Sequence, residues 1–153
     1  MSITISVLNF QGKEVIDACF EAILAQDLPK GYELQLVDNA STDGSGKYAF
    51  EKYPIPSMIE ADNKYQFITG LNDSFRYAKH EHVLFVTNDV EMQHGSIERL
   101  FQLSEKYPHA IIQPTFLWPD LSIQNAGMNW VWPAYGIADR HQGEFGSFSE
   151  TPI

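Results

Sequence analysis

The 153-residue sequence predicts a single α/β domain in which helices cover both faces of a doubly wound, mostly parallel sheet. Short apolar runs alternate with amphipathic stretches of helical periodicity over most of the chain. Turn-forming residues separate the two kinds of segment. The run within residues 82–86 is apolar enough for a strand that is buried on both faces of a parallel sheet.

The elements follow in the order strand, helix, strand along the chain. Strands are expected at residues 3–8, 32–37, 57–60, 82–86 and 110–115. Helices are expected at residues 13–26, from Ser45 to about 54, around 67–78 and at 96–106. Pro29 and Gly31 end the first helix, and Ser45 is the expected N-cap of the second. We expect residues 116–153 to be irregular, with an extra strand or hairpin at 121–126, and the domain to be incomplete at its C-terminus.

Composition narrows the classes of function. A net charge of −10 argues against nucleic acid as a main partner, whereas an anionic ligand remains possible if a divalent cation bridges it to the protein. The single cysteine, Cys19, excludes an internal disulfide and fits a reducing cytoplasm. Because it lies on the apolar face of a predicted helix, we expect a buried structural thiol. No apolar run approaches the roughly 20 residues that span a bilayer, and we expect no signal peptide.

Two predicted strands end in polar and acidic side chains. Asp38 ends the second strand, directly before Asn39 and Ser41, and Asp89 follows the strand at 82–86. Ligands bind at the carboxyl ends of strands in open α/β sheets, so both ends are candidate contacts. Asp38 offers an acceptor for a base or a ribose hydroxyl, although a plain Asx turn has the same residues. Asp89 suits Mg²⁺ or Mn²⁺, although a loop anchor or helix cap is the alternative.

Other chemistries lack their motifs. The sequence contains no dinucleotide fingerprint, no P-loop and no pattern of zinc ligands. Its five histidines are scattered, and only His94 follows closely behind Asp89. Aromatic residues gather at Trp118, Trp130 and Trp132. Such rings stack on sugars, but they also pack in ordinary cores and interfaces.

Six segments in this order resemble family 2 glycosyltransferases, and most closely the rhamnosyltransferase-like branch. They are residues 5–9, 19–26, 37–45, 63–72, 85–89 and 122–127. The similarity runs from about Ile3 to Gly146. It implies a GT-A (Rossmann-like) fold, a nucleoside-diphosphate sugar donor linked to UDP or dTDP, and a divalent metal ion, Mg²⁺ or Mn²⁺.

The resemblance also implies roles for individual residues. The implied nucleotide-binding residues are Leu8, Asn9, Asp38, Asn39, Ser41, Asn63 and Asn88, and the implied metal ligand is Asp89. The metal motif reads Thr87-Asn88-Asp89, so its first acidic position is missing. Family members continue past the region matching Gly146 into an acceptor-binding half that contains the general base. The catalytic residue therefore stays unknown, and we expect the general base to be absent from this chain.

The expected function is transfer of a sugar, with inversion and metal assistance, to a glycan or lipid-linked acceptor in polysaccharide biosynthesis. A catalytically silent nucleotide-binding or interaction module is the alternative, and a nucleotidyltransferase is a third. We expect a cytoplasmic protein, free or at the inner face of the membrane. The C-terminal aromatic residues Trp118, Trp130 and Trp132 are candidates for self-association if they are exposed.

Overall fold

The computed structural model describes the chain except residues 1, 63–66, 127, 132–135 and 140–153. The chain forms two compact units, residues 1–101 and 102–153, and each is described by itself. The predicted description as a single family domain stays a prediction.

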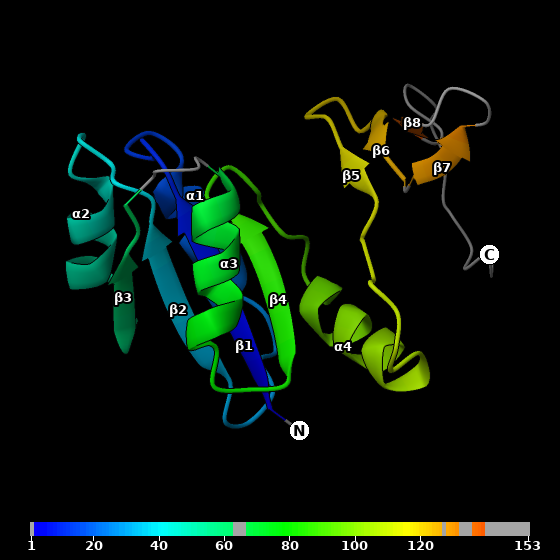
Figure 1. Ribbon diagram of the computed structural model, residues 1–153, viewed down its shortest axis with the longest axis horizontal. Helices are drawn as coiled ribbons and strands as arrows, with labels where there is room; N and C mark the ends of the chain where they lie inside the picture. Colours follow the sequence, from blue (N-terminus) through cyan, green and yellow to red (C-terminus); the bar gives the residue numbers. More distant parts are fainter. Residues whose placement is uncertain (1, 63–66, 127, 132–135, 140–153) are drawn as a thin grey trace. The chain divides into compact units, whose positions relative to one another are not determined.

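The first unit contains a four-stranded parallel sheet (Figure 1). Its strands are β1 (Ile3–Asn9), β2 (Glu33–Asp38), β3 (Ser57–Glu60) and β4 (His82–Thr87), in the order β3-β2-β1-β4. The helices of this unit are α1 (Ile16–Leu24), α2 (Ser45–Lys52) and α3 (Phe67–Tyr77), and α4 (Ser96–Lys106) begins in it and ends in the second unit. The strand order reverses at β1, which lies between β2 and β4. This arrangement confirms the predicted doubly wound α/β fold.

Helices lie on both faces of the sheet, with α3 in front of it and α1 behind it in Figure 1. The core is formed by apolar side chains from α1 and the two central strands, among which Ile5, Phe20 and Leu36 are fully buried. Phe20 stacks on Tyr53 at the end of α2, with 4.8 Å between the ring centroids. β1 and β2 are buried on both faces although apolar and polar residues alternate in them, so polar side chains such as Ser6 and Gln35 are buried as well.

Helix α3 approaches the sheet closely. A Cβ on Gly70 would overlap the end of the Leu8 side chain in β1, so any larger residue here would have to displace Leu8. Behind Gly70, the buried Gln35 amide donates to Ser6 Oγ at 3.0 Å and to the Ser74 carbonyl at 3.2 Å. The close approach carries Phe67, the first residue of α3, to the carboxyl end of β1.

A buried carboxylate ties the opposite, amino-terminal end of the sheet together. Glu33 in β2 accepts hydrogen bonds from Thr4 Oγ1 at 2.9 Å and from the Lys79 backbone N–H at 3.0 Å. Lys79 Nζ lies 2.8 Å from Glu33 Oε1. Burial acts to raise the pKa of Glu33, but these contacts hold it below its ordinary value. Glu33 therefore anchors the α3–β4 connection to β1 and β2.

The second unit contains two antiparallel strand pairs. They are β5 (Phe116–Leu117) with β6 (Ile123–Asn125), and β7 (Met128–Val131) with β8 (Gly136–Asp139). β6 lies in the segment 121–126, where an extra strand or hairpin was expected, whereas β5, β7 and β8 lie in segments that were expected to be irregular. In the first hairpin, the Asp120 carboxylate accepts from the backbone N–H and hydroxyl of Ser122, and this turn brings the two strands together.

Two smaller predictions were also wrong. Residues 110–115 form no strand, because the apolar run finds no ladder partner and the Ile111 side chain is fully exposed. Ser45 is the first residue of α2, and Gly44 is its N-cap, in a left-handed conformation with φ 79°. The expectation for Cys19 was right: the thiol is buried, and burial raises its pKa to about 12.

Candidate functional site

A cleft of about 590 Å³ opens at the carboxyl ends of β1, β2 and β4. It lies at the point where the strand order reverses, which is where open α/β sheets bind ligands. The side chains that line it are Leu8, Phe10, Asn39, Phe67, Thr87, Asn88 and Asp89. The walls are therefore aromatic and aliphatic, and the polar groups come from the ends of β2 and β4.

Backbone hydrogen bonds align the three strand ends. The Asn39 N–H donates to the Asn9 carbonyl at 2.8 Å, and the Asn88 N–H donates to the Leu8 carbonyl at 3.0 Å. These bonds continue the parallel ladders one step beyond the strands. The side chains after β2 and β4 are thus placed on either side of the end of β1.

The fully buried amide of Asn9 lies at the centre of a hydrogen-bonded group beneath the cleft. Its Nδ2 lies 2.6 Å from Asp38 Oδ1, 2.8 Å from Ser45 Oγ and 3.1 Å from Ser41 Oγ, and its two hydrogens are shared among these three acceptors. Its Oδ1 accepts from Asn88 Nδ2 at 2.7 Å. One side chain of β1 therefore joins the ends of β2 and β4 and the start of α2.

The Asp38 carboxylate is occupied by these internal contacts. Besides the Asn9 amide, it accepts from the Ser41 hydroxyl at 2.7 Å and from the Ser41 backbone N–H at 3.2 Å. A Cβ on Gly46 would overlap the carboxylate, so α2 also packs directly against it. Asp38 is half-buried, and it is not among the residues that line the cleft.

The loops after β1 and β2 are bound to each other. The Gln11 side chain donates to Thr42 Oγ1 at 2.9 Å and accepts from the Thr42 backbone N–H at 3.2 Å. Lys13 N–H donates to the Asp43 carboxylate at 3.0 Å. Gln11 and Ala40 have positive φ angles, 49° and 59°, so each loop holds a residue in a conformation that L-residues rarely adopt. The tight loops put local strain beside the cleft.

Asp43 supports the same loops from the side of α2. Its Oδ1 accepts from the Ser45 backbone N–H at 2.9 Å and from the Ser45 hydroxyl at 2.6 Å. Burial acts to raise the pKa of Asp43, but the hydrogen bonds from Ser45 and Lys13 hold it below its ordinary value. The charged form stabilises the first turn of α2, where the backbone N–H groups lack helical partners.

Asp89 is the single charged side chain in the described lining of the cleft. Its Oδ1 accepts from Thr87 Oγ1 at 2.6 Å, which orients the carboxylate. Among the described residues, no three His, Cys, Asp or Glu side chains cluster as a metal site. One carboxylate nonetheless fits Mg²⁺ or Mn²⁺, which are commonly held by one or two carboxylates together with water and substrate phosphates. The oxygen donors of this cleft are compatible with such an ion.

The structure brings together most of the predicted site, although their binding roles stay predictions. Leu8, Asn39, Asn88 and Asp89 line the cleft, whereas Asn9, Asp38 and Ser41 form the hydrogen-bonded group beneath it. Asn63 lies outside the described residues. Sequence reasoning missed Phe10, Phe67 and Thr87 as lining residues. Phe10 directly follows the first strand, and that position was the available signal. His94 contacts the Ala25 carbonyl beyond the end of α1 and does not line the cleft.

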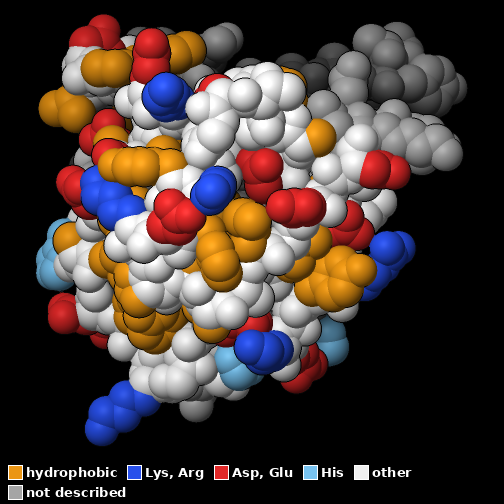
Figure 2. Space-filling view, turned by 90° about the vertical axis from the view of Figure 1, so that its left-hand side faces the viewer, with side chains coloured by type: hydrophobic (Ala, Val, Ile, Leu, Met, Phe, Trp, Pro, Cys, Tyr) orange, Lys and Arg blue, Asp and Glu red, His pale blue; other side chains and the backbone are white. Residues whose placement is uncertain are grey.

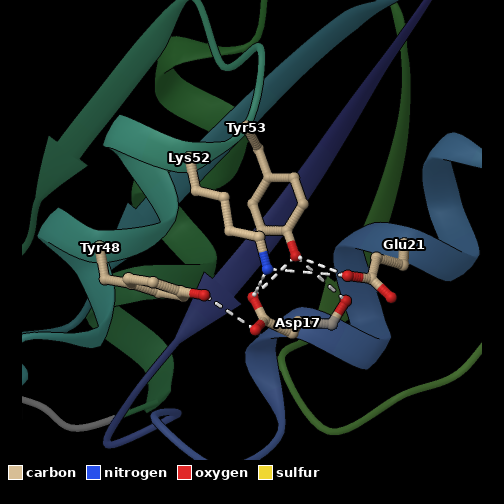
Figure 3. A network of polar contacts seen from close by, with 5 residues as sticks. All are labelled: Asp17, Glu21, Tyr48, Lys52 and Tyr53. Atoms are coloured by element: carbon tan, nitrogen blue, oxygen red, sulfur yellow. Dashed lines mark hydrogen bonds and ion pairs between the residues drawn. The ribbon is translucent and has the colours of Figure 1, made fainter.

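A second hollow, of about 460 Å³, lies between α1 and α2 beside an internal polar network. The Asp17 carboxylate accepts from Tyr48 and Tyr53 hydroxyls at 2.9 and 2.7 Å, and Lys52 Nζ lies 2.9 Å from it (Figure 3). The hydrogen bonds from Tyr53 and Lys52 lower the pKa of Asp17. Each of these groups already has a partner, so the network serves to hold α2 against α1.

On the face of the molecule in Figure 2, charged side chains of both signs are interspersed among apolar ones.

A doubly wound parallel sheet with a cleft at its switch point is a Rossmann-like arrangement, and it is the arrangement of GT-A domains. The chain belongs to glycosyl transferase family 2, whose family model matches residues 2–149. The family resemblance of the sequence is thereby confirmed.

The comparisons with single proteins agree with the family. A poly(ribitol-phosphate) beta-glucosyltransferase of Bacillus spizizenii is 30% identical over 112 residues, 69% of this chain and 18% of that protein. S. aureus TarS 1-349 has a similar fold (TM-score 0.61, 19% identity, 76% of this chain and 40% of that chain). Its complex with UDP is similar too (TM-score 0.58, 19% identity, 76% and 39%). The chain thus spans less than half the length of these proteins.

No helix in the described part of the chain is long and apolar enough to cross a membrane.

Proposed function

We propose that this chain binds a nucleoside-diphosphate sugar in the β1–β2–β4 cleft and forms the donor-binding part of a family 2 glycosyltransferase. The observation that carries the proposal is the cleft itself. It lies at the switch point of the sheet, has aromatic walls and holds one carboxylate, in a chain that belongs to this family. The complex of a structural neighbour with UDP supports a UDP-linked donor, with dTDP as the alternative.

The nucleoside would occupy the apolar part of the cleft. Phe10 and Phe67 are about half-exposed, at 49% and 48%, and Phe67 is held edge-on against Phe85 with 5.6 Å between the ring centroids. An exposed ring that is fixed by packing, as Phe67 is, suits stacking on a base, and Phe10 offers a second exposed ring. Asn39 and Leu8 would complete this wall, whereas the hydrogen-bonded group of Asn9, Asp38 and Ser41 would hold the wall in place.

The diphosphate would lie towards Asp89. The described lining contains no lysine or arginine, so the charge of a diphosphate needs another counter-charge. Asp89 would hold a divalent cation, Mg²⁺ or Mn²⁺, which as a Lewis acid stabilises negative charge on the leaving diphosphate. Thr87 would orient the Asp89 carboxylate through its hydroxyl.

Transfer would proceed with inversion to a glycan or lipid-linked acceptor. The Bacillus relative is a poly(ribitol-phosphate) beta-glucosyltransferase, which supports a polymer acceptor and a role in polysaccharide biosynthesis. Inverting displacement needs a general base within hydrogen-bond reach of the acceptor hydroxyl. The described cleft offers Asp89 alone as a carboxylate, and Asp89 is assigned to the cation.

Isothermal titration calorimetry with UDP and dTDP, each with Mn²⁺ and with EDTA, tests the donor site. We expect binding of at least one nucleotide that Mn²⁺ strengthens. A Phe10→Ala variant should weaken binding under both conditions, whereas Tyr107→Ala, an exposed aromatic residue of the second unit, serves as the matched control. The absence of any binding at millimolar nucleotide would contradict the proposal. Binding without turnover of UDP-sugars would favour the silent nucleotide-binding module.

A further inference from the structure

The Asn88 amide is held with a fixed polarity. Its Nδ2 donates to Asn9 Oδ1 at 2.7 Å and to the Phe10 carbonyl at 3.2 Å. An amide nitrogen carries two hydrogens, and these two acceptors use both. Asn88 is half-buried and lines the cleft. Only the oxygen end of its amide is left to face that cleft.

The polarity is imposed from Asp38 through Asn9. A carboxylate only accepts hydrogen bonds, so the end of the Asn9 amide at 2.6 Å from Asp38 must be its nitrogen. The Asn9 oxygen therefore faces Asn88, which in turn must present its nitrogen. The Phe10 carbonyl, a second pure acceptor, demands the same orientation. Asn88 thus donates to Asn9, and Asn9 donates to Asp38, so the hydrogen bonds all run in one direction. We call these three residues the amide relay.

Gly12 provides the space for the amide relay. A Cβ at this position would overlap both Asn9 Oδ1 and Asn88 Nδ2. The φ angle of Gly12 is not in the left-handed region, so conformational freedom is not the reason for glycine here. The absence of a side chain at residue 12 serves the contact between the two amides.

From this geometry we propose that the amide relay makes Asn88 a second protein oxygen ligand, next to Asp89, for the divalent cation of the donor complex. The inference rests on the proposed function and names Asn9 and Asp38 as positioning residues for that ion. It explains how a cleft with one carboxylate offers more than one hard oxygen donor, since amide oxygens are common ligands of such ions. It also gives Asp38 a role that does not require contact with the nucleoside.

The test is the gain in UDP affinity that Mn²⁺ produces, measured by calorimetry on the full 153-residue chain as the ratio of dissociation constants in EDTA and in Mn²⁺. For Asn88→Ala we expect this gain to fall about tenfold or more, because the affinity in Mn²⁺ falls by more than the affinity in EDTA. Gly12→Ala should reduce the gain in the same way, because its Cβ pushes the two amides apart although both asparagines are still present. Direct Mn²⁺ binding by electron paramagnetic resonance should weaken in parallel.

Two controls distinguish the relay from general damage. Gly70→Ala crowds Leu8 in the same cleft, so it should weaken UDP binding in EDTA and leave the Mn²⁺ gain unchanged. Asn72→Ala, an exposed asparagine on α3, should change neither quantity. If the parent protein binds no UDP, the proposed function fails. If it binds UDP with a Mn²⁺ gain that Asn88→Ala keeps, or if Asn88→Ala weakens binding equally in EDTA, the relay inference alone is overturned.

Discussion

Replacing Asn9 by leucine keeps the size of the side chain and removes every hydrogen bond that it makes. The lost bond to the Asp38 carboxylate is of the charged class and is worth about 1.5–3 kcal/mol. The bonds with Ser45 and Asn88 are of the neutral class, about 0.5–1.5 kcal/mol each. Asn9 is fully buried, so water cannot replace it for these partners. We expect the free energy of unfolding to fall by about 3–5 kcal/mol, a large share of the roughly 5–15 kcal/mol of a typical domain.

The assay is urea unfolding followed by circular dichroism, with the midpoint lowered and the m-value unchanged. Asn72→Leu, the same change on the exposed surface of α3, is the matched control and should stay within about 0.5 kcal/mol of the parent. A loss below about 1 kcal/mol for Asn9→Leu would refute the reasoning that this amide joins the three strand ends.

Three further predictions concern other parts of the first unit. The pKa of Glu33 is held below its ordinary value of 4.5, so its charge stabilises the fold above pH 4.5 and this contribution disappears as the pH falls through the lowered pKa. Glu33→Gln should therefore be about 2–4 kcal/mol less stable at pH 7 and lose less stability than the parent between pH 5 and 3; equal slopes in urea titrations would contradict this. Ala40→Gly should stabilise the protein by about 0.5–1 kcal/mol, because glycine accepts a φ of 59°. The control Ala49→Gly, inside α2, should destabilise the protein. A lower Tm for Ala40→Gly would contradict the proposed backbone strain at residue 40. Phe67→Ala should weaken UDP binding by about 1–2 kcal/mol through lost stacking, and Phe75→Ala, exposed further along α3, should not; equal losses would exclude a specific role.

The sheet of the first unit was predictable because its strands and helices have strong local patterns. β3 and α4 begin and end where the sequence predicts, since a short apolar run and a 3.6-residue periodicity are both local signals. The apolar run at 110–115 misled because a strand exists only when another strand pairs with it. The six residues 110–115 by themselves do not indicate whether another strand pairs with them.

The sequence predicted where the candidate site lies. It did not predict which of the residues line the cleft and which bond to one another beneath it. Asp38 was expected to contact the nucleotide because it ends a strand, and Asn9 and Asn88 because the family resemblance implies it. Their hydrogen bonds to one another join residues 29 and 79 positions apart, and only the folded sheet shows them. Phe67 was placed on a helix face, and its arrival at the cleft depends on the close approach of Gly70 to Leu8.

The most direct test of the donor site is hydrogen–deuterium exchange of the chain with and without UDP and Mn²⁺, read peptide by peptide. Binding in the β1–β2–β4 cleft predicts slower exchange in residues 8–12, 39–45 and 87–90, with little change in residues 107–125 of the second unit. Protection confined to the second unit, or its absence at residues 87–90 while UDP is bound, would contradict the account.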